Sequence, residues 1–138
     1  MISQLSNLNW MSVLLAFVAY FFLGAMWFTV FFKKIYAVSL GKEHDLPAKP
    51  AAIFIIGPAI CSLVITITSA ILIYALGIST VNGVLEFAAV VGIGYLVANT
   101  VNIAINPNIP RPILYGMISG TYHLAGIIIV SCILVLMK

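Results

Sequence analysis

The amino-acid sequence predicts an all-α protein that spans a membrane as a four-helix bundle, and three observations lead to this fold class. Hydrophobic residues make up 64% of the 138 positions and charged residues only 7%, whereas about a quarter of a soluble domain is charged. Four apolar stretches are each long enough to cross a hydrocarbon core, which takes about 20 helical residues. The stretches are continuously apolar, unlike the alternating strands of a membrane β-barrel. We therefore expect one integral membrane domain over residues 1–138.

The expected spans cover residues 9–32, 51–76, 83–105 and 112–137. Helix-stopping and turn-forming residues mark their limits: Lys33 and Lys34 after the first span, Pro50 before the second, residues 77–83 between the second and third, and residues 106–110 before the fourth. The first ten residues contain no Lys or Arg, and the apolar stretch after them is too long for a signal peptide. The first span is therefore expected to stay in the protein as an anchor.

The basic residues beside the spans predict the orientation in the membrane. Five lie in the loops after the first and third spans, and one lies on the opposite side: Lys33, Lys34, Lys42, Lys49 and Arg111 against Lys138. Basic loops stay in the cytoplasm. We therefore expect both loops in the cytoplasm and both termini outside it.

The formal net charge of +3 comes from these loops, so it does not describe a nucleic-acid-binding face. The lipid bilayer is the expected partner, because the basic residues flank apolar runs. Further copies of the chain and an unidentified small solute or ion are the other candidate partners.

Signals for catalysis and metal binding are weak. A metal site needs three or four ligands at defined spacings, and no such set, nucleophile–base pair or phosphate-binding glycine loop can be assembled. No metal, cofactor or catalytic residue is therefore expected, and the sequence does not decide whether the protein is an enzyme. Glu86 is expected to be an interfacial carboxylate in the first turn of the third span.

Polar residues inside the third and fourth spans form two helical stripes. The residues are spaced four and three apart, as on one face of a helix: Ala88, Gly92, Tyr95, Asn99, Asn102 and Asn106 in the third span, and Gly116, Ser119, Gly120, His123, Gly126 and Val130 in the fourth. Amides that faced lipid would lack hydrogen-bond partners. Small residues such as Gly92, Gly116, Ser119 and Gly120 allow close helix packing. The stripes are therefore expected to pack together, with His123 facing Tyr95 and Asn99.

These groups allow two interpretations. In one, they only hold helices together, each interhelical hydrogen bond contributing about 1 kcal/mol. In the other, His123 is a titratable element in mid-membrane, and further polar groups line its site: Asn99, Asn102, Tyr95, Tyr122 and Trp27. In the first span, Tyr20, Gly24, Trp27 and Phe31 share a face that could complete this lining.

The corresponding functions are the binding or passage of a small solute or proton between the third and fourth spans, or a structural or regulatory membrane subunit. In the second case the polar stripes serve only helix packing and oligomerisation. Both alternatives remain open from the residues.

Short motifs in both halves resemble the DUF1761 family. Gly24-Ala25-Met26-Trp27-Phe28 and Phe32-Lys33 are similar to its first-span motifs, although Phe28 stands where the family usually has Tyr. Asn102, Arg111-Pro112, Leu114 and Gly120-x-Tyr122-His123-Leu124 are similar to its second half. The resemblance implies a small bacterial, four-span protein of the inner membrane with no assigned activity.

Overall fold

The computed structural model describes residues 1–45 and 51–138, and within these ranges the chain is helical and contains no strand. Four helices are long and apolar enough to cross a membrane: Trp10–Phe31, Ile53–Ala75, Val81–Ala104 and Pro112–Leu136. They begin and end close to the predicted limits, and the predicted all-α membrane bundle is confirmed. Lys49 and Pro50, which contributed to the expected orientation and to one span limit, lie outside the described residues.

The helical elements follow one another along the chain as η1 (Ile2–Ser6), α1 (Trp10–Met26), η2 (Trp27–Phe31), α2 (Lys33–Ser39), α3 (Ile53–Ala75), α4 (Val81–Phe87), η3 (Ala88–Val97), α5 (Ala98–Ala104) and α6 (Pro112–Leu136). The first span consists of α1 and the π-helical η2, and the third consists of α4, the π-helical η3 and α5. Helix α4 begins at Val81 because the Thr80 hydroxyl caps it by accepting from the Gly83 amide. Glu86 therefore lies in the second turn instead of the first.

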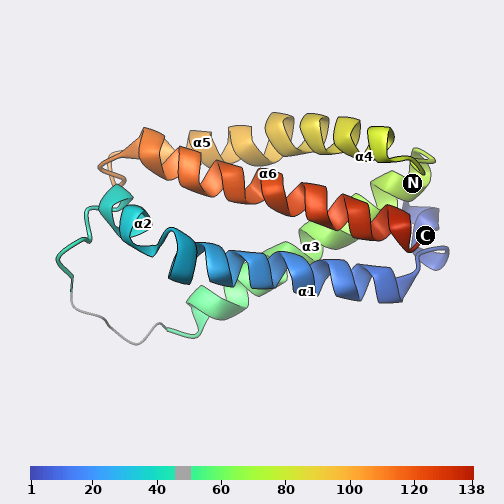
Figure 1. The fold of residues 1–138 in the computed structure, drawn as a ribbon, viewed down its shortest axis with the longest axis horizontal. Helices are drawn as coiled ribbons and strands as arrows, with labels where there is room; N and C mark the ends of the chain where they lie inside the picture. Colours follow the sequence, from blue (N-terminus) through green and yellow to red (C-terminus); the bar gives the residue numbers. More distant parts are fainter. Residues whose placement is uncertain (46–50) are drawn as a thin grey trace.

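Helix α6 is the centre of the bundle. Figure 1 shows α6 between the third span on one side and α1 on the other, with α3 crossing behind. In its most apolar window 50% of the residues are buried, against 17–22% in the other spans. The buried core joins α1, α3 and α6 through Val13, Ala16, Tyr20, Ala70, Ile73, Ile127, Val130 and Leu134.

Hydrogen bonds at one end of the bundle and an ion pair at the other connect its segments. At the end that holds both termini (Figure 1), Nδ2 of the Asn9 side chain donates to the Met137 carbonyl over 2.7 Å, and Lys138 Nζ donates to the Ile78 carbonyl over 3.2 Å. At the opposite end, Arg111 and Glu43 form an ion pair of 3.5 Å that connects the two basic loops. Lys33 and Lys34 are exposed at the start of α2.

The π-helical segment η3 changes which face of the third span meets α6. A π-helix bonds each amide to the carbonyl five residues earlier, so it turns less per residue than an α-helix. Gly92 is buried as expected, but the next residues against α6 are Val97 and Val101. The expectation that Tyr95, Asn99 and Asn102 face the fourth span is wrong: Tyr95 is 71% exposed, and both asparagines are exposed.

Candidate functional site

Tyr20 on α1 and His123 on α6 form a hydrogen-bonded pair between the first and fourth spans. The Tyr20 hydroxyl and His123 Nδ1 are 2.6 Å apart, and Tyr20 is completely buried. Both residues lie near the middle of their spans. His123 therefore contacts the first span instead of the third, and its partner is Tyr20 instead of Asn99.

Aromatic side chains surround this pair. Tyr122 stacks on Tyr20 with ring centroids 5.3 Å apart, and it contacts Trp27 at 6.4 Å. Trp27 Nε1 donates to the Ile118 carbonyl over 3.1 Å. Tyr20 and Trp27 thereby have hydrogen-bond partners inside the protein for their polar atoms, which hydrocarbon would not offer. Tyr122 and Trp27 were both predicted as site candidates. Tyr122 lies beside His123, with ring centroids 4.8 Å apart, and Trp27 lies beside Tyr122.

Two glycines make room for these rings. A Cβ atom at Gly126 on α6 would overlap the Tyr20 ring, and one at Gly24 on α1 would lie 2.8 Å from the Tyr122 hydroxyl. The shared first-span face that contains Tyr20, Gly24 and Trp27 thus packs against the fourth span. The cluster is tightly filled, and its geometry is that of a packed core.

The aromatic contacts continue to the end of the bundle near α2. Phe28 contacts both Tyr122 and Tyr36, with centroids 5.2 and 4.7 Å away, and Tyr36 contacts Tyr115 at 5.7 Å. Burial, and next the neighbouring Tyr115 phenol, raises the pKa of Tyr36, so this phenol is neutral at physiological pH.

The third and fourth spans meet through small residues and branched apolar side chains. A Cβ atom at Gly116 or Gly120 would lie 3.2 Å from Val101 or Val97, and one at Gly92 would lie 2.8 Å from Ile127. Ser119 is buried nearby, and its hydroxyl has no hydrogen-bond partner in the described part of the chain. The contact surface is apolar and closed along these residues.

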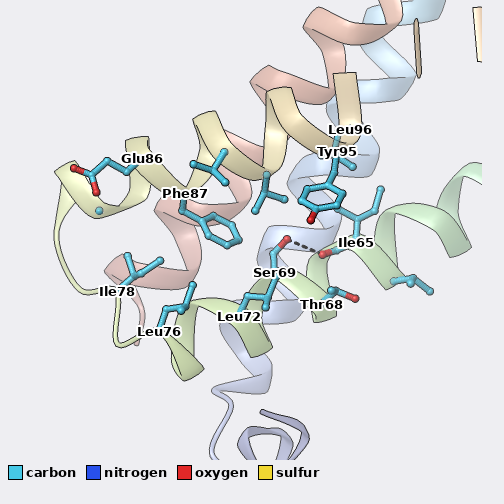
Figure 2. Close-up of a pocket in the computed structure, with 14 residues that line it drawn as sticks. Ile65, Thr68, Ser69, Leu72, Leu76, Ile78, Glu86, Phe87, Tyr95 and Leu96 are labelled. Atoms are coloured by element: carbon cyan, nitrogen blue, oxygen red, sulfur yellow. Dashed lines mark hydrogen bonds between the residues drawn. The ribbon is translucent and has the colours of Figure 1, made fainter. Parts of the chain in front are cut away.

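A groove of about 710 Å³ lies between the second and third spans. Figure 2 shows α3 forming one wall and the third span the other, with the side chains of Thr68, Ser69, Leu72, Phe87 and Tyr95 between them. Helix α3 packs on α1 and α6, and its distance from the third span grows away from the turn at Gly77 that joins them (Figure 1). Gly77 has φ +66°, a conformation that favours glycine.

The polar atoms of the groove are few. Ser69 Oγ donates to the Ile65 carbonyl of its own helix over 2.8 Å. Neither the Tyr95 nor the Thr68 hydroxyl makes a hydrogen bond to another described residue, and Figure 2 shows the two side chains on opposite walls. Glu86 lies at the end near the chain termini.

Sequence reasoning placed Tyr95 in a polar surface but missed this groove. Thr68 and Ser69 were a weak signal, because serine and threonine in a membrane helix usually bond their own carbonyls, as Ser69 does.

Within residues 1–45 and 51–138, no three His, Cys, Asp or Glu side chains are grouped as metal ligands, and Cys61 and Cys132 are free thiols.

A family model described as "Protein of unknown function (DUF1761)" matches residues 11–135, which is most of the chain. No curated protein and no solved structure matches.

Proposed function

Because the chain belongs to the DUF1761 family, whose description assigns no function, we propose a function from its geometry: this membrane protein binds a small, largely apolar solute inside the bilayer. The groove between α3 and the third span carries the proposal. Its volume of about 710 Å³ lies within the usual range for small-molecule sites, about 300–1,000 Å³. Its walls are mostly apolar, with a few hydroxyl groups to orient a ligand.

The groove supports binding better than the surface between the third and fourth spans supports passage. Val97, Val101 and Ile127 fill the space against three glycines there, which leaves no room for a polar path. In this proposal His123 is a packing group: its bond to Tyr20 holds the first and fourth spans together.

Filling the groove tests the proposal. Thr68→Trp places a large ring in the groove from α3, and Thr121→Trp makes the same change on the exposed surface of α6. Wild-type protein in phosphatidylcholine vesicles is expected to immobilise a spin-labelled long-chain alcohol, measured as a motionally restricted component by electron paramagnetic resonance. Thr68→Trp should remove that component, and Thr121→Trp should retain it. Equal immobilisation by both variants would refute groove binding.

The orientation of the protein is part of the proposal. The basic loops with Lys33, Lys34 and Arg111 favour a cytoplasmic position for that end and an extracytoplasmic one for both termini, in a bacterial inner membrane. A periplasm-active reporter fused after Lys138 should be active, and a cytoplasm-active one should be silent. The reverse pattern would overturn the orientation.

A second candidate function is a structural or regulatory subunit that acts as a homo-oligomer. Asn99 and Asn102 are exposed and make no side-chain hydrogen bond to another described residue. Lipid cannot satisfy an amide within hydrocarbon, whereas the amide of a second copy can both donate and accept. Nearby Gly94 has open space where a Cβ would stand, so another helix can approach closely.

Cysteine cross-linking separates this candidate from a monomer. In a chain whose Cys61 and Cys132 are replaced by alanine, Ala98→Cys is expected to form a disulfide-linked dimer on mild oxidation. Leu14→Cys, on an exposed face of α1, is the control and should remain monomeric. Equal cross-linking of both variants, or none at Ala98→Cys, would contradict this interface.

A further inference from the structure

Among the described residues that line the groove, Glu86 is the charged one, and its position indicates the chemical class of the ligand. We propose that the groove binds a lipophilic amine, with the ammonium group at Glu86 and the alkyl chain along the apolar walls towards Tyr95. This inference rests on the proposed function, because it names the ligand of the same groove.

Glu86 is suited to hold a cation. It is exposed on α4 and lines the groove, and the ion pair of the described residues is the one between Arg111 and Glu43 at the other end of the bundle. At the same end of the bundle, Lys138 Nζ donates to the Ile78 carbonyl and lies 4.8 Å from the Tyr74 ring centroid. The carboxylate is therefore available to a ligand.

The depth of Glu86 matches an amphiphile that enters from the membrane surface. Glu86 lies in the second turn of the third span, close to its end at Val81. An ammonium there keeps contact with interfacial water, so it avoids the large cost of burying an ion in hydrocarbon. The carboxylate adds attraction that a neutral headgroup would not receive.

The rest of the groove matches an alkyl body. Tyr95 follows Glu86 by nine residues, most of them in the π-helical η3, so the two side chains lie at different depths along the groove. Between them the walls present side chains such as Leu72, Phe87 and Val90. At the deep end, the Tyr95 and Thr68 hydroxyls offer hydrogen bonds to a ligand with a polar group at that depth.

A lipid whose ammonium is joined to a phosphate fits this site less well. The phosphate would lie beside the Glu86 carboxylate, where two like charges repel. An amine without an adjacent anion can pair with the carboxylate through its ammonium group and contact both apolar walls through its alkyl chain. The geometry therefore favours a simple lipophilic amine over a zwitterionic phospholipid.

Matched probes test the inference. Decylamine, which is protonated at pH 7, and decanol have the same chain and differ in headgroup. Each competes against the spin-labelled alcohol in phosphatidylcholine vesicles, and its apparent affinity is corrected for partitioning into protein-free vesicles. Glu86→Gln is expected to weaken decylamine about fivefold and to leave decanol unchanged. Asp45→Asn removes one exposed carboxylate from the opposite end and should change neither.

The outcomes separate this inference from the proposed function. If Glu86→Gln leaves decylamine unaffected while decanol still competes, the amine assignment is wrong and groove binding stands. Equal weakening by Glu86→Gln and Asp45→Asn would show a general charge effect and would also overturn the assignment. If neither probe competes and Thr68→Trp has no effect, both proposals fail.

Discussion

Replacing Gly126 by alanine tests how tightly the first and fourth spans are packed around the Tyr20–His123 pair. The added Cβ atom would overlap the Tyr20 ring, and Tyr20 is completely buried and cannot turn into solvent. Overpacking a core costs about 1–3 kcal/mol. Displacing the ring would also break its hydrogen bond to His123, for a further loss of about 1 kcal/mol. The free energy of unfolding should therefore fall by about 2–4 kcal/mol.

The measurement is the free energy of unfolding in mixed detergent micelles, followed by circular dichroism. Gly94→Ala, in micelles dilute enough to keep the protein monomeric, is the matched control, because no atom of the chain lies within 4 Å of its added Cβ and alanine is the better helix former. This control should be neutral or slightly stabilising. In a Tyr20→Ala background the cost of Gly126→Ala should largely disappear, because the ring that it displaces is absent. A loss below about 0.5 kcal/mol for the single variant, or an undiminished loss in the double variant, would refute the packing argument.

Three further substitutions have predictable costs in the same unfolding measurement. Trp27→Phe removes the hydrogen bond to the Ile118 carbonyl, and the expected loss of about 1 kcal/mol should exceed that of Trp10→Phe at the exposed start of α1. Gly77→Ala forces a side chain into a backbone with φ +66°; we expect a loss of about 1–2 kcal/mol despite the open space around it, and an unchanged midpoint would contradict the strain. Arg111→Gln removes an exposed ion pair, so it should cost at most about 1 kcal/mol at low salt and nothing at 1 M salt.

The four spans could be predicted from the sequence because hydrocarbon imposes length and apolarity on each of them. Turn-forming residues such as those between Leu76 and Val81 then set the limits. The beginning of α4 was displaced by two residues because the Thr80 cap satisfies a free amide at the helix start. Capping by a hydroxyl is readable in sequence, but Thr80 lies in a stretch with several competing turn formers.

The facing residues of the third span could not be predicted, because the π-helical segment leaves no clear mark in the sequence. The expected stripe assumed a constant 3.6 residues per turn. Ten residues of π-helix rotated the positions after Gly92, so Val97 took the place expected for Tyr95. The same rotation exposed Asn99 and Asn102 and left His123 to bond with Tyr20. Identifying Tyr20 as the partner of His123 required knowledge of how the helices are ordered around α6, and the hydropathy of the spans does not reveal this order.

The central position of α6 has a consequence for biosynthesis. During translation the first three spans enter the membrane before the helix against which α1 and the third span both pack. Until α6 follows, the Tyr20 hydroxyl has no imidazole beside it, and Val97 and Val101 face lipid. Assembly is therefore expected to be completed in one late step. A ribosome that stalls before Pro112 should yield an incompletely packed set of membrane helices, with α1 and α3 in contact but the third span unattached, that proteases remove.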